Sequence, residues 1–218
     1  MEMDAGDFGL IMDALGAKFQ NDQLLSQAFV HDSFVNESLD SEIKSNERLE
    51  FLGDRVVNLV IAEELYARLP DWSEGRLSEA HSALVRTESL ARVSKSLGLG
   101  QHLKLGKGEE GSGGNSRPSN LEAVFEAVVG AVFLDQGYIC VQRFILNVMG
   151  PEIDDVIAGD RPLKDPKTRL QELVHVLGMA LPVYRVVNVV GRDHERTFTV
   201  EVIVEGKVEG ISTGRSKL

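Results

Sequence analysis

The stretch NERLEFLGD, residues 46–54, places three carboxylates on adjoining turns of one predicted helix. Glu47, Glu50 and Asp54 are separated by three, four and seven positions, which are spacings that share a helical face. Carboxylates stacked in this way repel one another unless positive charge lies between them. A divalent cation is one source of that charge, because hard cations prefer carboxylate oxygens. The alternative is a solvated helix face on which nearby arginines pair with the acids.

This stretch begins the clearest predicted helix, which covers residues 46–69 and is ended by Pro70. Apolar residues recur at helical spacing through the first two thirds of the chain, and the aromatic content is only 6%. We therefore expect a mainly α protein. The same periodicity predicts further helices over residues 8–15, 22–30, 73–85, 87–97, 119–134 and 138–149.

The helix predicted over residues 119–134 carries one acid within an otherwise apolar run. In LEAVFEAVVGAVFLD, residues 121–135, Glu126 has Ala, Val, Phe and Leu neighbours, so its carboxylate is expected to be at least partly buried. A buried carboxylate has to be protonated, paired or bound to a metal. If the two helices pack together, Glu50, Asp54 and Glu126 form an oxygen-only site suited to Mg²⁺, for which Mn²⁺ can substitute.

The charge distribution and the cysteine content limit the partners and the cellular location that we expect for the chain. The net charge of −11 divides into −14 for residues 1–160 and +3 for residues 161–218, so the basic tail is the part suited to a nucleic acid. The single cysteine, Cys140, excludes an intramolecular disulfide and suits a cytoplasmic location. The longest apolar stretch is too short for a membrane span, so no membrane partner is expected.

Two breaks divide the chain. The Gly- and Ser-rich stretch at residues 106–119 predicts an exposed loop, and AGDRPLK at residues 158–164 predicts a linker. Residues 1–157 then form a helical domain, and residues 165–218 form a small α+β module. That module is expected to contain a helix from about residue 165 to 178, strands over residues 183–190 and 197–204, and a short strand over residues 208–212.

These motifs resemble a known family. NERLEFLGD closely resembles the signature of ribonuclease III, and FEAVVGAVFLD, residues 125–135, looks like that family's second acidic helix. DPKTRLQE, residues 165–172, followed by strands, resembles a double-stranded-RNA-binding domain. The likeness covers most of the chain from about residue 24, in the family's domain order. It implies an all-helical endonuclease domain followed by an RNA-binding domain.

By this resemblance the chain is a homodimeric enzyme that hydrolyses double-stranded RNA with Mg²⁺, leaving 5′-phosphate and 3′-hydroxyl products with staggered ends, in the processing of rRNA or mRNA precursors. Glu50 and Glu126 match metal-ligand positions, and Asp54 and Glu126 match positions needed for catalysis. The supporting acids implied by the resemblance are Glu47 and Glu74. Phe51 is similar to an aromatic residue that fills a pocket on the partner subunit, although it also fits a core position.

The tail residues expected to contact RNA lie on the predicted helix face, in the loop between strands and near the C-terminal end. Double-stranded RNA is read through its shape, by contacts to 2′-hydroxyls and phosphates. These expected contacts are Thr168, Gln171, Glu172, His194 and Lys217, with Arg192 and Arg215 nearby.

The sequence departs from the family pattern in two places. The family usually has an acid or another polar residue three positions before the second glutamate, where this chain has Ala123, with Glu122 beside it. The chain also stops at Leu218, where the RNA-binding domain would continue into a helix, so Phe198, Val200 and Val202 are expected to be exposed. These departures leave open a non-cleaving RNA-binding homodimer of the same fold. A helical metal-binding or regulatory dimer is less favoured.

Overall fold

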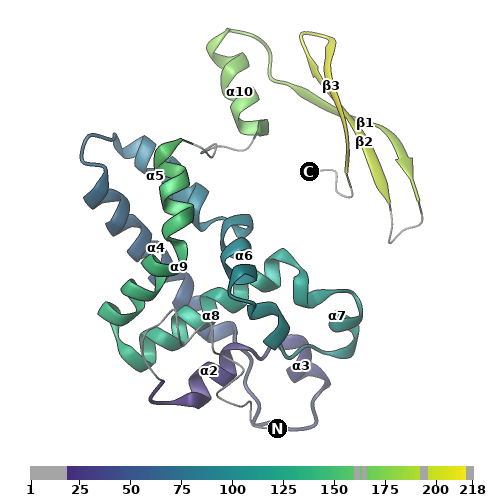
Figure 1. The fold of residues 1–218 in the computed structure, drawn as a ribbon. Coiled ribbons are helices and arrows are strands. Elements are labelled where there is room, and N and C mark those ends of the chain that lie inside the picture. Colours follow the sequence, from purple (N-terminus) through teal and green to yellow (C-terminus); the bar gives the residue numbers. More distant parts are fainter. Residues whose placement is uncertain (1–18, 160–162, 164–165, 192–195, 215–218) are drawn as a thin grey trace. The chain divides into compact units, whose positions relative to one another are not determined.

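The computed structural model describes residues 19–159, 163, 166–191 and 196–214, and it divides into two compact units, Met1–Leu163 and Lys164–Leu218. The first unit is helical and the second combines one helix with a three-stranded sheet, as the sequence predicted (Figure 1). The helix expected over residues 8–15 lies outside the described residues. No helix in the described part of the chain is long and apolar enough to cross a membrane.

Two long helices form the centre of the first unit. Helix α4 (Glu47–Arg68) buries one apolar face, and α8 (Pro118–Gln136) is buried along most of its length. Helix α8 packs against α4, α2 (Asp22–Ala28), α6 (Thr87–Ser96) and α9 (Tyr138–Ala158) (Figure 1). An apolar helix such as α8 is stable in water only when its neighbours cover it on several sides, which explains its central place.

The remaining helices close the unit around this pair. Helix α5 (Glu74–Val85) packs against α4 and α9, and its N-terminal cap is Ser73, whose hydroxyl accepts from the backbone N–H of Arg76. The sequence did not predict α3 (Asp32–Glu37), which has only six residues and no buried side chain to reveal it. A short 3-10 helix, η2 (Leu99–His102), follows α6.

Helix α9 continues beyond its predicted end. The sequence suggested an end at Met149, before Pro151, but the helix runs on to Ala158. A proline inside a helix costs about 3 kcal/mol through its missing N–H donor. Burial of Met149, Ile153 and Val156 on either side of Pro151 offsets this cost.

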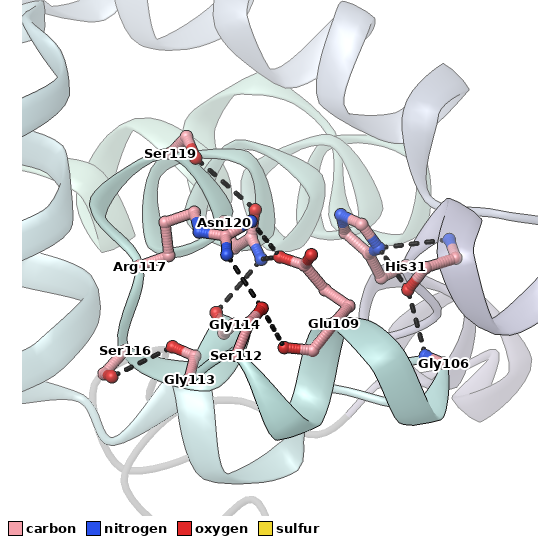
Figure 2. A network of polar contacts seen from close by, with 11 residues as sticks. His31, Gly106, Glu109, Ser112, Gly113, Gly114, Ser116, Arg117, Ser119 and Asn120 are labelled. Atoms are coloured by element: carbon pink, nitrogen blue, oxygen red, sulfur yellow. Dashed lines mark hydrogen bonds and ion pairs between the residues drawn. The ribbon is translucent and has the colours of Figure 1, made fainter. Parts of the chain in front are cut away.

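The expectation of an irregular loop at residues 106–119 is wrong. This stretch contains α7 (Lys107–Gly111) and a 3-10 turn, η3 (Gly114–Ser116). Polar contacts hold it in place (Figure 2): the Glu109 carboxylate accepts from Asn120 Nδ2 at 2.8 Å and from the Arg117 guanidinium. Asn120 Nδ2 also donates to the Gly114 carbonyl at 3.0 Å. Glycine-rich composition therefore did not prevent order, because side chains supply the bonds.

The second unit contains α10 (Pro166–Val176) and an antiparallel sheet in the order β1-β2-β3. The strands are β1 (Val183–Val190), β2 (Thr197–Val204) and β3 (Lys207–Gly214), with β3 longer than predicted. Phe198, Val200 and Val202 are half-buried rather than exposed, because β2 lies between the other two strands. No helix follows β3 among the described residues.

Candidate active site

The two acidic helices touch through their backbones. A Cβ atom added at Gly53 of α4 would lie 1.7 Å from the carbonyl oxygen of Glu126, and one at Gly130 of α8 would lie 2.3 Å from that of Leu49. Only glycine allows such an approach, since any side chain would push the helices apart. This close crossing brings the acids of α4 next to those of α8.

Glu126 is buried at this crossing. It is 7% exposed, which confirms the burial expected from its apolar surroundings in the sequence. Burial first, and then the neighbouring carboxylates of Glu122 and Glu50, raise the pKa of Glu126 to about 8, against a lowering effect of Arg55. The site therefore holds more negative charge than its surroundings stabilise.

Glu50 and Glu122 complete the acidic cluster, which we define as Glu50, Glu122 and Glu126. Burial raises the pKa of Glu50, and Glu47 and Glu122 add to this effect. Burial also raises the pKa of Glu122, while a hydrogen bond with Thr87 opposes the rise. The electrostatic influence of Glu122 on both other members shows that it lies close to them, although it is one position away from the expected place at residue 123.

Asp54 is positioned differently from the cluster. Its Oδ1 accepts from Asn58 Nδ2 at 2.6 Å, and its Oδ2 is paired with the Arg55 guanidinium. Asn58 is held in turn through its carbonyl, which lies 3.1 Å from His81 Nε2 of α5. Among the residues that the structure describes, no three carboxylate, imidazole or thiol groups are placed to hold one metal ion. Glu50, Asp54 and Glu126 are therefore not arranged as one closed set of metal ligands in this structure.

The two supporting acids lie at helix starts. Glu47 opens α4 and accepts from the Ser45 hydroxyl at 2.9 Å, and it raises the pKa of Glu50. Glu74 opens α5 and accepts from the Ser78 hydroxyl at 2.8 Å. Glu74 is not among the groups that shift the pKa values of the cluster. Of the two supporting acids that the sequence predicted, the structure thus shows an electrostatic effect on the cluster for Glu47 alone.

Phe51 points out of the first unit. Its side chain is 66% exposed, and the Arg55 guanidinium carbon lies 5.1 Å from the centre of its ring. The reading of Phe51 as a core residue is therefore wrong. Leu59 and Tyr66, also exposed, follow it on α4 at spacings of eight and seven, so the three lie on one face.

In the second unit, Thr168, Gln171 and Glu172 lie on α10 at the spacing of a common face. Thr168 and Gln171 are half-buried and Glu172 is exposed. His194 and Lys217 lie outside the described residues, as do Arg192 and Arg215. The structure therefore places three of the five expected RNA contacts on one helix.

Three residues of the site were not assigned a role from the sequence. Thr87 reaches Glu122 from α6, and Asn58 and His81 support Asp54 from two helices. Their part depends on how α4, α5, α6 and α8 pack, and no motif in the sequence signals it. Only the spacing of four between Asp54 and Asn58 gave a local hint of contact.

Known proteins resemble this chain over most of its length. A family model described as ribonuclease-III-like matches residues 21–153, and a double-stranded RNA binding motif matches residues 166–217. "Ribonuclease 3" of Desulforamulus reducens is 45% identical over 203 residues, covering 93% of this chain and 82% of the relative. "Ribonuclease 3" of Lactococcus lactis subsp. cremoris is 43% identical over 213 residues, covering 97% and 87%.

A solved structure adds the fold-level match. The nuclease domain of ribonuclease III from Campylobacter jejuni, described as flexible in a region involved in dimer formation, is 34% identical. It aligns with a TM-score of 0.60 over 65% of this chain and 95% of that one. Since the family model covers residues 21–153 and the relatives match nearly the whole length, the chain belongs to the ribonuclease III family.

Proposed function

We propose that this chain is a homodimeric, magnesium-dependent endonuclease that cuts double-stranded RNA and leaves 5′-phosphate and 3′-hydroxyl ends. The observation that carries the proposal is the buried Glu126 carboxylate at the crossing of α4 and α8, with Glu50 and Glu122 beside it. A second unit that matches a double-stranded RNA binding motif supplies the substrate class. Family membership supports cleavage rather than binding alone.

The donor set fits Mg²⁺. It contains only carboxylate oxygens, which are the ligands that Mg²⁺ and Mn²⁺ prefer over zinc-type nitrogen and sulfur donors. Glu50, Asp54 and Glu126 would hold the ion, and Glu122 supplies further negative charge in place of the acid absent at Ala123. When bound, the ion neutralises charge on the scissile phosphate and favours ionisation of the attacking water.

The chain's own residues prepare this site. Glu126 has to release its proton to serve as a ligand, because its raised pKa keeps it protonated at neutral pH in the metal-free protein. Asp54 has to give up part of its pairing with Arg55 and Asn58. Glu47 and Glu74, which lie at the starts of α4 and α5, are the acids that we assign to the surroundings of the RNA.

The exposed face of α4 is our proposed dimer contact. Phe51, Leu59 and Tyr66 are 66%, 56% and 77% exposed, which is unusual for three large apolar side chains on one helix. In a dimer with two-fold symmetry each subunit contributes the same surface to the interface, so the face with Phe51, Leu59 and Tyr66 would pack against the same face of the partner subunit. Two active sites then act on the two strands, which accounts for staggered ends.

The second unit is proposed to hold the duplex by its shape. Thr168, Gln171 and Glu172 on α10 would face the minor groove, with His194 and Lys217 assigned from sequence alone. The single cysteine fits a reducing, cytoplasmic setting. Precursors of rRNA and mRNA are the substrates that the family suggests.

A cleavage assay tests the proposal. The full chain is incubated with a long end-labelled RNA duplex in magnesium or in chelator, beside single-stranded RNA and duplex DNA. We expect only the RNA duplex to be cut, and only with magnesium. Glu126→Gln should abolish cutting and leave duplex binding in a native gel intact, whereas Glu110→Gln, which alters an exposed glutamate on α7, should cut normally. An uncut duplex with wild-type protein would overturn the proposal.

A further inference from the structure

Arg55 lies between two features with separate roles. Its guanidinium pairs with the Asp54 carboxylate and also lies 5.1 Å from the centre of the Phe51 ring. The side chain is 63% exposed, so water rather than packing surrounds the rest of it. The face of an aromatic ring attracts a cation at this distance, so Phe51 favours this placement of the guanidinium.

Both oxygens of Asp54 are already engaged by the chain. Oδ2 is paired with Arg55, and Oδ1 accepts from Asn58 at 2.6 Å. Arg55 also acts electrostatically on Glu126 across the helix crossing. It is therefore a positive charge shared by two of the proposed metal ligands.

We propose that Arg55 is a positioning residue that serves as a built-in counter-cation for Asp54 and sets how tightly the site binds a divalent metal. This inference rests on the proposed function. A metal ion bound to Asp54 has to displace the guanidinium or bind beside its positive charge, and both oppose binding. Removing that charge, with the carboxylates left in place, therefore strengthens metal binding.

The contact with Phe51 links this effect to the proposed dimer face. Phe51 and Arg55 are one helical turn apart, so a partner subunit that surrounds the Phe51 ring changes the place available to the guanidinium. Metal affinity and subunit association are then coupled through two side chains of the same helix. No movement of the helices is needed for this coupling.

The proposal is tested by measuring the binding of Mn²⁺ to the whole chain. The electron paramagnetic resonance signal of the free ion reports how much Mn²⁺ remains unbound at a fixed protein concentration. We expect Arg55→Gln to bind Mn²⁺ roughly three- to tenfold more tightly, the size expected for loss of one partly exposed charge near the ion. Arg55→Lys keeps the charge and should stay close to wild type. Arg48→Gln is the matched control, because Arg48 is exposed on α4 and has no ion pair among the described residues.

The outcomes separate this inference from the proposed function. Wild-type affinity in Arg55→Gln, or an equal gain in Arg48→Gln, would overturn the role of Arg55 and leave the endonuclease proposal standing. Weaker Mn²⁺ binding in Arg55→Gln would show that Arg55 supports metal binding, and it would also overturn the inference that Arg55 opposes it. A wild-type protein that binds no Mn²⁺ would overturn the proposed metal site itself. As a second readout, the magnesium concentration for half-maximal cleavage should fall in Arg55→Gln and remain unchanged in Arg48→Gln.

Discussion

Replacing Glu126 by glutamine is expected to stabilise the metal-free protein, and to stabilise it more as the pH rises. Burial first, and then the Glu122 and Glu50 carboxylates, raise the pKa of Glu126 from 4.5 to about 8. Between these two values the folded state keeps a proton that the unfolded chain has lost. The free energy of unfolding of the wild type therefore falls as the pH rises through this window and levels off above it.

The size of this effect follows from the difference between the two pKa values. One pKa unit corresponds to about 1.4 kcal/mol, so the titration of Glu126 lowers the free energy of unfolding by about 5 kcal/mol above pH 8 and by about 3 kcal/mol at pH 7, relative to its value well below pH 4.5. Glutamine has nearly the same shape but does not ionise. The gain in Glu126→Gln should therefore be small near pH 4.5 and should grow toward that upper value.

Urea unfolding followed by circular dichroism measures this gain. Wild type, Glu126→Gln and the exposed control Glu110→Gln are compared in chelator from about pH 5 to about pH 9, at one protomer concentration because a dimer is stabilised by mass action. Added magnesium should stabilise the wild type and not Glu126→Gln. A difference between the two proteins that stays constant with pH would refute the reasoning, and so would a Glu126→Gln protein that is less stable at high pH.

Four further substitutions test other parts of the structure. Gly53→Ala should lower the free energy of unfolding by about 3 kcal/mol and abolish cleavage, because the new methyl would meet a carbonyl oxygen of α8; thermal unfolding and the gel assay measure these effects. Glu122→Gln should raise the magnesium concentration for half-maximal cleavage several-fold and Ala123→Asp should lower it; an unchanged requirement in Glu122→Gln would remove that carboxylate from the site. Hydrogen bonds from Asn120 and Arg117 lower the pKa of Glu109. As the pH falls through this lowered pKa, the amides of α7 in the wild type should lose protection against hydrogen exchange. In Glu109→Gln most of this protection should be missing even at neutral pH.

Local patterns were enough to predict the central helices and the burial of one acid. The bounds of α4 and α8 follow from the spacing of their apolar residues, with Pro70 and Gly137 near their ends. Glu126 was recognisable because it interrupts an apolar run, and this signal needs no knowledge of the fold. The alternation along β2 likewise predicted a strand.

Contacts between distant segments were not predictable in the same way. The order of α7 depends on Glu109 bonding to Asn120 and Arg117, and nothing in a Gly-rich stretch indicates those partners. The hydrogen bond between Thr87 and Glu122 joins two helices that are far apart in sequence. Asp54 was assigned as a metal ligand from its spacing, but spacing does not tell whether an adjacent arginine already engages its carboxylate.

The glycine crossing of α4 and α8 has a consequence for engineering this protein. The distance between the two helices is set by main-chain atoms at Gly53 and Gly130, not by the volumes of the surrounding side chains. Stabilising substitutions elsewhere in the core, such as the replacement of a valine by isoleucine, therefore leave the spacing of the acids unchanged. Thermal tolerance and catalytic geometry become separately adjustable properties, provided that the two glycines are kept.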